Sequence, residues 1–194
     1  MSFTELFIAF IMGLIILLYI KSYYGEVEYV HSKLDDRKYL VRKLPDRKDA
    51  ADMLSRLNAK LTRLVQHVKA GGGKPGGGID PADARRLYDN YNPDALSEGG
   101  TEVGYTSYSV NKGEKIVMCL RHRDTTFVDE NVLVYVAVHE LGHLMTDEIG
   151  HTDRFWSNFR ALLREAVSLG LYAKVDFAAK PVSYCGINIT SSVI

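Results

Sequence analysis

Cysteine is scarce in this chain, and so is any surplus of charge. The 194 residues include two cysteines, Cys119 and Cys185, which are too few for a disulfide framework and lack the spacing of a cysteine zinc site. We therefore expect each to be a small apolar core residue in a reducing compartment. Lysine plus arginine and aspartate plus glutamate number 24 each, so no basic field favours nucleic acid as a partner.

One hydrophobic run stands out, at the N-terminus. Residues 6–20 carry no charge, and a bilayer core needs about 20 mostly apolar residues, so we predict a transmembrane anchor over residues 1–24. No lysine or arginine precedes the run, but four occur in residues 21–38. This bias predicts a single-pass protein whose C-terminal domain is cytosolic, or on the equivalent side of a virion membrane. The glycosylation sequence at Asn188 would be used only on the opposite side.

The rest of the chain divides by composition. Residues 25–69 predict a β-hairpin followed by an amphipathic helix, residues 70–80 a glycine-rich linker, and residues 81–194 the main domain. Within that domain we expect a loop over residues 90–100, strands near 104–110 and 114–120, and a helix over 152–169. The amphipathic helix also carries a basic stripe, which is typical of a solvated face, made of Arg56, Lys60, Arg63 and His67.

The candidate chemistry lies in the motif His139-Glu140-Leu141-Gly142-His143. An apolar run over residues 132–138 predicts a buried helix, and on a helix residues four apart share a face, so both histidines can bind one metal ion. Glu140 can then act on a metal-bound water without being a ligand.

A catalytic zinc usually has three protein ligands, and His151 is the best candidate for the third. Gly150 precedes it and can turn the chain back toward the metal. Asp153 and Glu165 are the alternative third ligands. We thus predict a Zn²⁺ site of His139, His143 and His151.

The motif, with Gly150, His151 and Phe155 after it, resembles the WLM/SprT-like group of zinc metallopeptidases. Residues 106–117 and 180–186 are similar to WLM-domain proteins of large DNA viruses of algae and protists. The resemblance covers roughly residues 29–194. It implies an α+β fold, namely a minimal zincin (gluzincin-like) domain with an HExxH helix and a small antiparallel sheet. It also implies the three histidines as zinc ligands and Glu140 as the catalytic acid and base.

The sequence departs from parts of this group. The gap between His143 and His151 differs from the yeast-type pattern, where the third histidine comes sooner. A metzincin would place that histidine where Ile149 stands, which excludes that class. Eukaryotic relatives cleave proteins crosslinked to DNA, but the anchor and the balanced charge fit that substrate poorly.

We therefore expect a membrane-anchored zinc metallopeptidase that hydrolyses peptide bonds in a protein or peptide substrate. A zinc-bound water would attack with Glu140 as the general base, Tyr184 could assist, and an edge strand could hold the substrate. The alternative is a structural, minor-capsid-like protein that retains a protease-like zinc domain and contacts viral capsid or inner-membrane proteins. Glu140 favours the enzyme, because a structural zinc needs no base and usually has four ligands.

Overall fold

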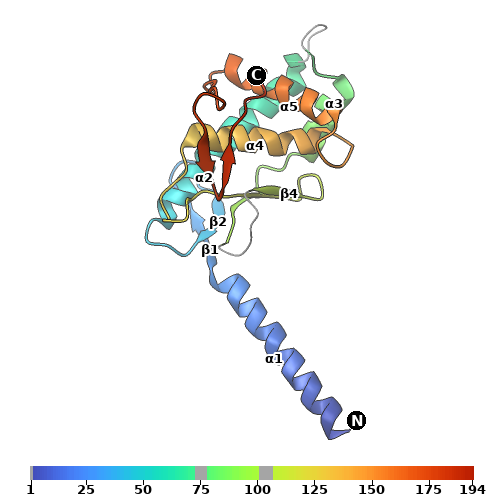
Figure 1. Ribbon diagram of the computed structural model, residues 1–194, viewed down its shortest axis with the longest axis vertical. Helices are drawn as coiled ribbons and strands as arrows, with labels where there is room; N and C mark the ends of the chain where they lie inside the picture. The colour runs from blue at the N-terminus through green and yellow to red at the C-terminus, as the bar shows by residue number, and fades with distance from the viewer. Residues whose placement is uncertain (1, 73–77, 101–106) are drawn as a thin grey trace.

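The computed structural model describes residues 2–72, 78–100 and 107–194. The fold is a mixed α+β arrangement, in which one long helix projects from a compact body (Figure 1). The predicted linker lies partly outside the described residues, as does the start of the strand predicted at residue 104. The elements are α1 (Phe3–Gly25), β1 (Val27–His31), β2 (Lys38–Arg42), α2 (Arg47–His67), the short π-helical turn η1 (Val68–Gly72), α3 (Pro81–Asn90), β3 (Leu96–Glu98), β4 (Tyr108–Val110), β5 (Lys115–Met118), α4 (Glu130–Met145), α5 (Asp153–Ser168), β6 (Val182–Tyr184) and β7 (Ile187–Ile189).

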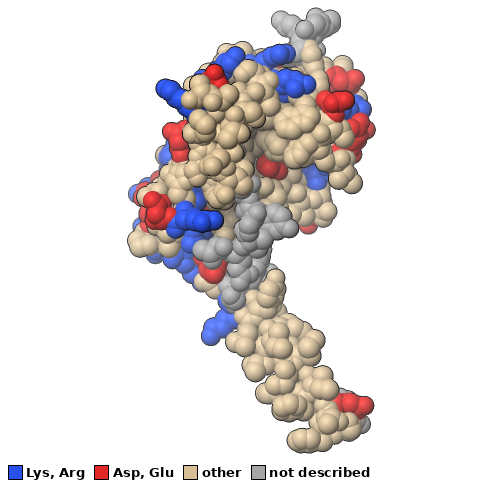
Figure 2. All heavy atoms as spheres, in the orientation of Figure 1, with Lys and Arg blue, Asp and Glu red and all other residues tan. Residues whose placement is uncertain are grey.

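Helix α1 is the hydrophobic run predicted from the sequence. A capping box starts it, because the hydroxyl of Ser2 accepts from the N–H of Glu5, and the carboxylate of Glu5 accepts from the N–H of Ser2. Every side chain from residue 3 to residue 21 is exposed, and the helix is nearly free of charge along its length (Figure 2). It is long and apolar enough to cross a membrane.

The main sheet has five strands in the order β1-β2-β3-β5-β4. The predicted hairpin is confirmed, since β1 and β2 pair antiparallel from Val27 opposite Arg42 to His31 opposite Lys38. Strand β3, however, lies within residues 90–100, where we expected a loop, and it pairs parallel with both β2 and β5. The expectation of a small antiparallel sheet is therefore wrong in this part, because two of the four pairings are parallel.

Helices α2 and α4 cover one face of this sheet, and α3 and α5 pack against α4 (Figure 1). The helical spacing predicted for α2 is confirmed by its buried apolar face, and each fully buried leucine contributes about 2 kcal/mol. Residues of α2 belong to the same hydrophobic core as those of α4 and α5. The segments on either side of the glycine-rich stretch thus share one core and one sheet.

A buried ion network holds β3 in place. The guanidinium of Arg121 binds the carboxylates of Glu98 at 2.8 Å and Asp46 at 2.6 Å, and the side chains of Arg121 and Glu98 are each 1 % exposed. The N–H of Arg42 donates to the other oxygen of Glu98. Asp46 is the N-cap residue of α2, but its side chain makes no capping hydrogen bond, because Arg121 holds its carboxylate and lowers its pKa.

The two cysteines correct a second expectation. Cys119, just after β5, and Cys185, in the turn between β6 and β7, form a disulfide across 66 residues. They are therefore not separate apolar core residues. The cause is the segment after α5, which forms the β6–β7 hairpin and brings Cys185 to the end of β5.

Candidate metal centre

Helix α4 carries the histidine motif, as predicted. Asp129 caps its first turn by accepting from the N–H groups of Asn131 and Val132. The apolar run that follows is buried except for the half-buried Val136, which fixes the rotation of the helix. As a result, His139 and His143 point from successive turns into a cleft.

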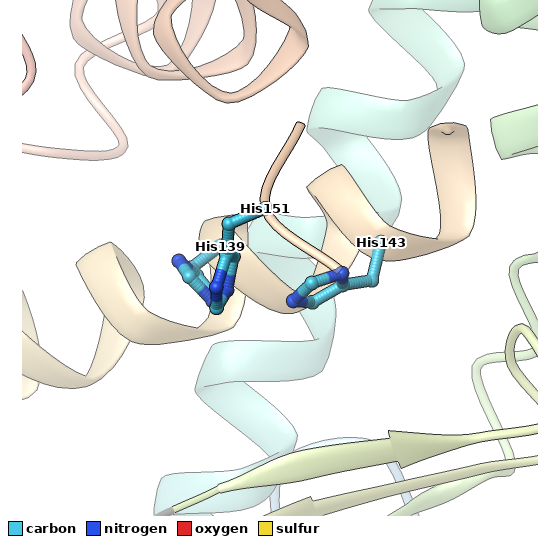
Figure 3. Close-up of side chains that lie close together, drawn as sticks. All are labelled: His139, His143 and His151. Carbon is cyan, nitrogen blue, oxygen red and sulfur yellow. The ribbon is translucent and has the colours of Figure 1, made fainter. Parts of the chain in front are cut away.

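The three predicted histidines converge at this point (Figure 3). The ring centroids of His139 and His143 are 5.0 Å apart, and each lies 4.9 Å from that of His151. One nitrogen from each ring lies within 4.8 Å of the others, and the Nε2 atoms of His139 and His151 are 3.0 Å apart. Tetrahedral zinc ligands at ~2.0–2.1 Å from the ion lie about 3.4 Å from one another, so this donor set fits zinc.

Protonation also favours metal binding, which requires neutral imidazole. Burial, followed by the neighbouring His143 and His151, lowers the pKa of His139 to about 3. Burial, followed by His151 and Lys112, lowers the pKa of His143 to about 4. At neutral pH both rings are therefore uncharged imidazoles, each with one nitrogen free to bind a metal.

Aromatic side chains of α5 pack against the histidine rings. Phe155 stacks on His143 with 4.3 Å between centroids and meets His139 edge-on at 4.9 Å. Gly142 makes this approach possible, because a Cβ atom there would lie 3.0 Å from the ring of Phe155. The glycine in the motif thus serves the packing of α5 on α4.

The end of α4 is held by side chains that the sequence did not reveal. The last carbonyls of a helix lack helical partners. Here Lys112 binds the carbonyls of His143, Thr146 and Glu148, with Nζ–O distances of 3.3, 2.6 and 2.9 Å. Asn90 donates to the carbonyl of Leu144, and Arg86 donates to that of Met145. The α4–α5 connection that carries His151 is therefore fixed from the β4–β5 turn and from α3.

Asp83 forms the centre of a second hydrogen-bond network, which joins α3 to α5 and to the end of α4. Its carboxylate accepts from Arg86, Arg154 and Asn158, and the amide of Asn158 also donates to the hydroxyl of Thr146. Burial alone would raise the pKa of Asp83, but hydrogen bonds from Arg154, Asn158 and Arg86 outweigh it, and the pKa is lowered. Gly150, with a φ of +87°, then turns the chain into His151.

The general base proposed from the sequence lies beside the histidines. Glu140 is 4 % exposed, and burial raises the pKa of its carboxyl to about 7, although hydrogen bonds from the hydroxyl and the N–H of Ser109 oppose the shift. Ser109 belongs to β4, the last strand of the sheet. Glu140 thus lies between the histidine cluster and the edge strand.

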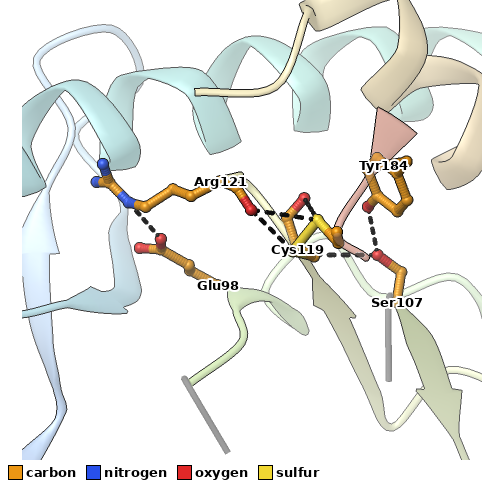
Figure 4. The surroundings of a disulfide bond; sticks show 6 residues. Glu98, Ser107, Cys119, Arg121 and Tyr184 are labelled. Atoms are coloured by element: carbon orange, nitrogen blue, oxygen red, sulfur yellow. Dashed lines mark hydrogen bonds and ion pairs between the residues drawn. A yellow bond between two sulfur atoms is a disulfide. The ribbon is translucent and has the colours of Figure 1, made fainter. Parts of the chain in front are cut away.

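The opposite wall of the cleft comes from the β6–β7 hairpin. The hydroxyl of Tyr184 lies 2.6 Å from that of Ser107, and Ser107 also accepts from the N–H of Cys119 (Figure 4). The disulfide therefore joins the hairpin to the sheet next to Tyr184. The cleft has a volume of about 770 Å³, within the ~300–1,000 Å³ range of ligand sites, and appears as a hollow in the face of the body (Figure 2).

The alternative ligands do not join the cluster. Among the described residues, the group able to hold a metal consists of the three histidines, without Asp153 or Glu165. Glu165 instead pairs with His67 of α2 at 3.0 Å. Two more residues of the basic stripe, Arg56 and Lys60, bind Glu130 of α4 at 2.9 and 2.7 Å. The stripe therefore joins α2 to α4 and α5.

Comparisons with known proteins find viral relatives. The chain is 29 % identical to "Uncharacterized protein R325" of Acanthamoeba polyphaga mimivirus, in an alignment covering 96 % of the chain and 95 % of the relative. It is 35 % identical to protein 136R of Invertebrate iridescent virus 6 over 48 % of the chain and 53 % of that relative. It is 43 % identical to protein 042R of Invertebrate iridescent virus 3, over 34 % of the chain and 42 % of that relative. No family model and no solved structure matches.

Proposed function

We propose that this chain is a zinc-dependent metallopeptidase of the WLM/SprT-like kind, with a minimal zincin domain on an N-terminal membrane anchor. One observation carries the proposal. Three imidazoles whose nitrogens lie within 4.8 Å of one another share a cleft with a buried carboxyl group, that of Glu140. Three nitrogen ligands and an adjacent base are what a hydrolytic zinc site requires.

In the proposed reaction, His139, His143 and His151 hold the ion. When bound, zinc supplies Lewis-acid polarisation of water and of a carbonyl group. Glu140 accepts the proton of the attacking water and returns it to the leaving amine. Its carboxylate lies in the cleft beside the histidines, and hydrogen bonds from Ser109 orient it for both transfers. General acid–base help of this kind contributes ~10²–10⁴-fold.

The second candidate is a structural, minor-capsid-like role in a virion membrane, with capsid or inner-membrane proteins as partners. The exposed apolar helix α1 and the viral origin of the relatives favour it. A scaffold would need the fold and the metal but not the basicity of Glu140. The two candidates therefore differ at this one side chain.

Metal content tests the proposed ligands. Purified protein should hold one zinc per chain, and His151→Ala should reduce its zinc affinity. Asp153→Ala is the matched control, because it removes the neighbouring carboxylate outside the cluster. Unchanged zinc content in His151→Ala would reject the proposed third ligand, and a loss of zinc in Asp153→Ala or Glu165→Ala would then identify its replacement.

Glu140→Gln tests the reaction, because glutamine has nearly the same shape but cannot accept the proton. Cleavage of an unfolded protein should fall by at least ~10²-fold while zinc content and folding stay normal. A chelator should abolish wild-type cleavage. If zinc-loaded wild type cleaves no more than the variant, the peptidase proposal fails and the structural role is favoured.

We also propose that α1 spans a membrane with residues 25–194 on the cytosolic side, or on the equivalent side in a virion. The basic flank after the helix supports this orientation. The Cys119–Cys185 disulfide argues for the opposite side, because disulfides persist in oxidising compartments. Asn188 is exposed in β7, so it reports the outcome directly. Glycan on Asn188 in a eukaryotic host would reverse the proposed orientation.

A further inference from the structure

The β6–β7 hairpin presents one apolar face and one polar face. Tyr184 pairs with Ile187 and Val182 with Ile189, so these four side chains lie on the same side of the hairpin. Ser183 and Asn188 pair on the other side, and both are exposed. Tyr184, Ile187 and Ile189 line the cleft of the histidine cluster.

Packing within the protein buries only part of the apolar face of the hairpin. Tyr184 is fully buried, but its partner across the hairpin, Ile187, is 50 % exposed and lines the cleft. Ile149, in the loop just before His151, also lines the cleft and is 93 % exposed. Exposed isoleucines on the rim of a concave site can gain binding energy from an apolar ligand group.

The charges around the cleft do not suit an acidic ligand. Of the described residues that line it, Lys112 is the one lysine or arginine, and its ammonium group already binds three carbonyls. Glu140 and Glu148 are the acidic lining residues. Among the described lining side chains, an acidic group would therefore meet carboxylates and no free lysine or arginine, so attraction would have to come from the proposed zinc ion alone.

The hairpin is held in position before any ligand arrives. It forms a two-stranded sheet separate from the five-stranded one, and it is joined to the latter by the Cys119–Cys185 disulfide and the Tyr184–Ser107 contact. Both attachments lie near β4, the edge strand beside Glu140. An ordered wall binds with a smaller entropic cost than a mobile one.

We propose that this wall is a specificity subsite for an aliphatic or aromatic side chain of an extended polypeptide. The side chain next to the scissile bond contacts Ile187 and Ile189 while the peptide backbone passes Glu140. The substrate class is then flexible or unfolded protein segments with a residue such as leucine or phenylalanine at that position. This inference rests on the proposed peptidase function and adds its specificity.

Binding without turnover tests the subsite. The full chain carrying Glu140→Gln, in detergent and without reductant, is titrated with short fluorescent peptides of serine and threonine. Each peptide has leucine, alanine, aspartate or lysine at its centre. Burying a leucine side chain is worth about 1.5 kcal/mol or more, so the leucine peptide should bind at least ~10-fold more tightly than the others by fluorescence anisotropy.

Three hairpin variants locate the effect. Ile187→Asp should remove the preference for leucine, whereas Asn188→Asp, with the same charge on the polar face of the same strand, should retain it. Ile187→Thr is a milder change in case aspartate disrupts the hairpin, and it should weaken leucine binding several-fold. The disulfide is checked by mass in each variant.

The outcomes separate the subsite from the peptidase function. Equal binding of the leucine and alanine peptides, a preference for lysine, or equal losses in Ile187→Asp and Asn188→Asp would overturn the subsite. Turnover by wild type is measured separately. If the leucine preference follows Ile187 but wild type cleaves nothing, the subsite stands and the peptidase function fails.

Discussion

Asp83 is the side chain at which one substitution should reveal how the site is supported. It lies on α3, away from the histidines, and its side chain is 2 % exposed. It receives hydrogen bonds at 2.8 and 3.0 Å from Arg154, at 3.0 Å from Asn158, and a further one from Arg86. Asp83→Asn keeps the shape but removes the charge and one accepting oxygen.

Breaking a buried charge pair costs ~3–5 kcal/mol. Asparagine still offers one acceptor, so we expect the free energy of unfolding to fall by about 3 kcal/mol, or Tm by ~6–12 °C in a domain of this size. Asp147→Asn is the matched control. Asp147 pairs with the same Arg86 and Arg154, at 3.5 Å, but is 51 % exposed, so its loss should cost ~0–1 kcal/mol.

The effect of pH follows from the direction of the pKa shift. The folded pKa of Asp83 is lowered, so its stabilisation is present above the unfolded value of ~3.9 and is lost as pH falls through the folded pKa. The difference in the free energy of unfolding between wild type and Asp83→Asn should thus be constant from about pH 5 to 8 and shrink below about pH 4. Urea unfolding followed by the single tryptophan, Trp156, measures it. Equal losses in Asp83→Asn and Asp147→Asn would refute the reasoning.

Three further predictions concern the cleft. With a chelator present, the free energy of unfolding of Glu140→Gln should exceed that of wild type by up to about 3 kcal/mol at pH 8 and by nothing at pH 4. The reason is that burial raises the pKa of Glu140 from 4.5 to about 7, so the ionised carboxylate destabilises the folded state. A pH-independent difference in urea titrations would contradict this. Gly142→Ala should displace Phe155 and weaken zinc binding, as measured by calorimetry, even though alanine favours a helix by about 1 kcal/mol relative to glycine. An unchanged zinc affinity would count against the close contact between Gly142 and Phe155. Replacing both Cys119 and Cys185 by serine should lower the free energy of unfolding by about 4 kcal/mol, because the disulfide spans 66 residues. Reductant should lower the free energy of unfolding of wild type, measured in urea, to that of the serine variant. No effect of reductant would mean that the disulfide does not stabilise the fold.

The parts of the fold that the sequence predicted are those with local signals. The apolar run before His139, the spacing of α2 and α5, and the alternation of β1 and β2 each need only neighbouring residues to be recognised. The convergence of His151 with the motif was also predictable, because a short connection follows α4 and the ligand spacing restricts its path.

The missed features depend on contacts between distant residues. Strand β3 has three residues and takes its place from parallel neighbours and from the ion pair of Glu98 with Arg121, none of which is visible in residues 90–100. The disulfide joins cysteines 66 residues apart, which composition alone could not pair. The carbonyl contacts of Lys112 follow from the position of the β4–β5 turn, and a lone lysine in a turn gives no such signal.

The disulfide also sets an order of events in time. Cys185 follows Cys119 by 66 residues and comes after both α4 and α5, so these helices must be synthesised before the bond can form. Helix α4, with its histidines and Glu140, emerges earlier than the hairpin that forms the apolar wall. Forming the bond also requires the removal of two electrons by an oxidant. Oxidation of the two thiols is therefore a separate step that follows the synthesis of α4, and a reduced chain carries its histidine cluster before the wall opposite it is covalently attached.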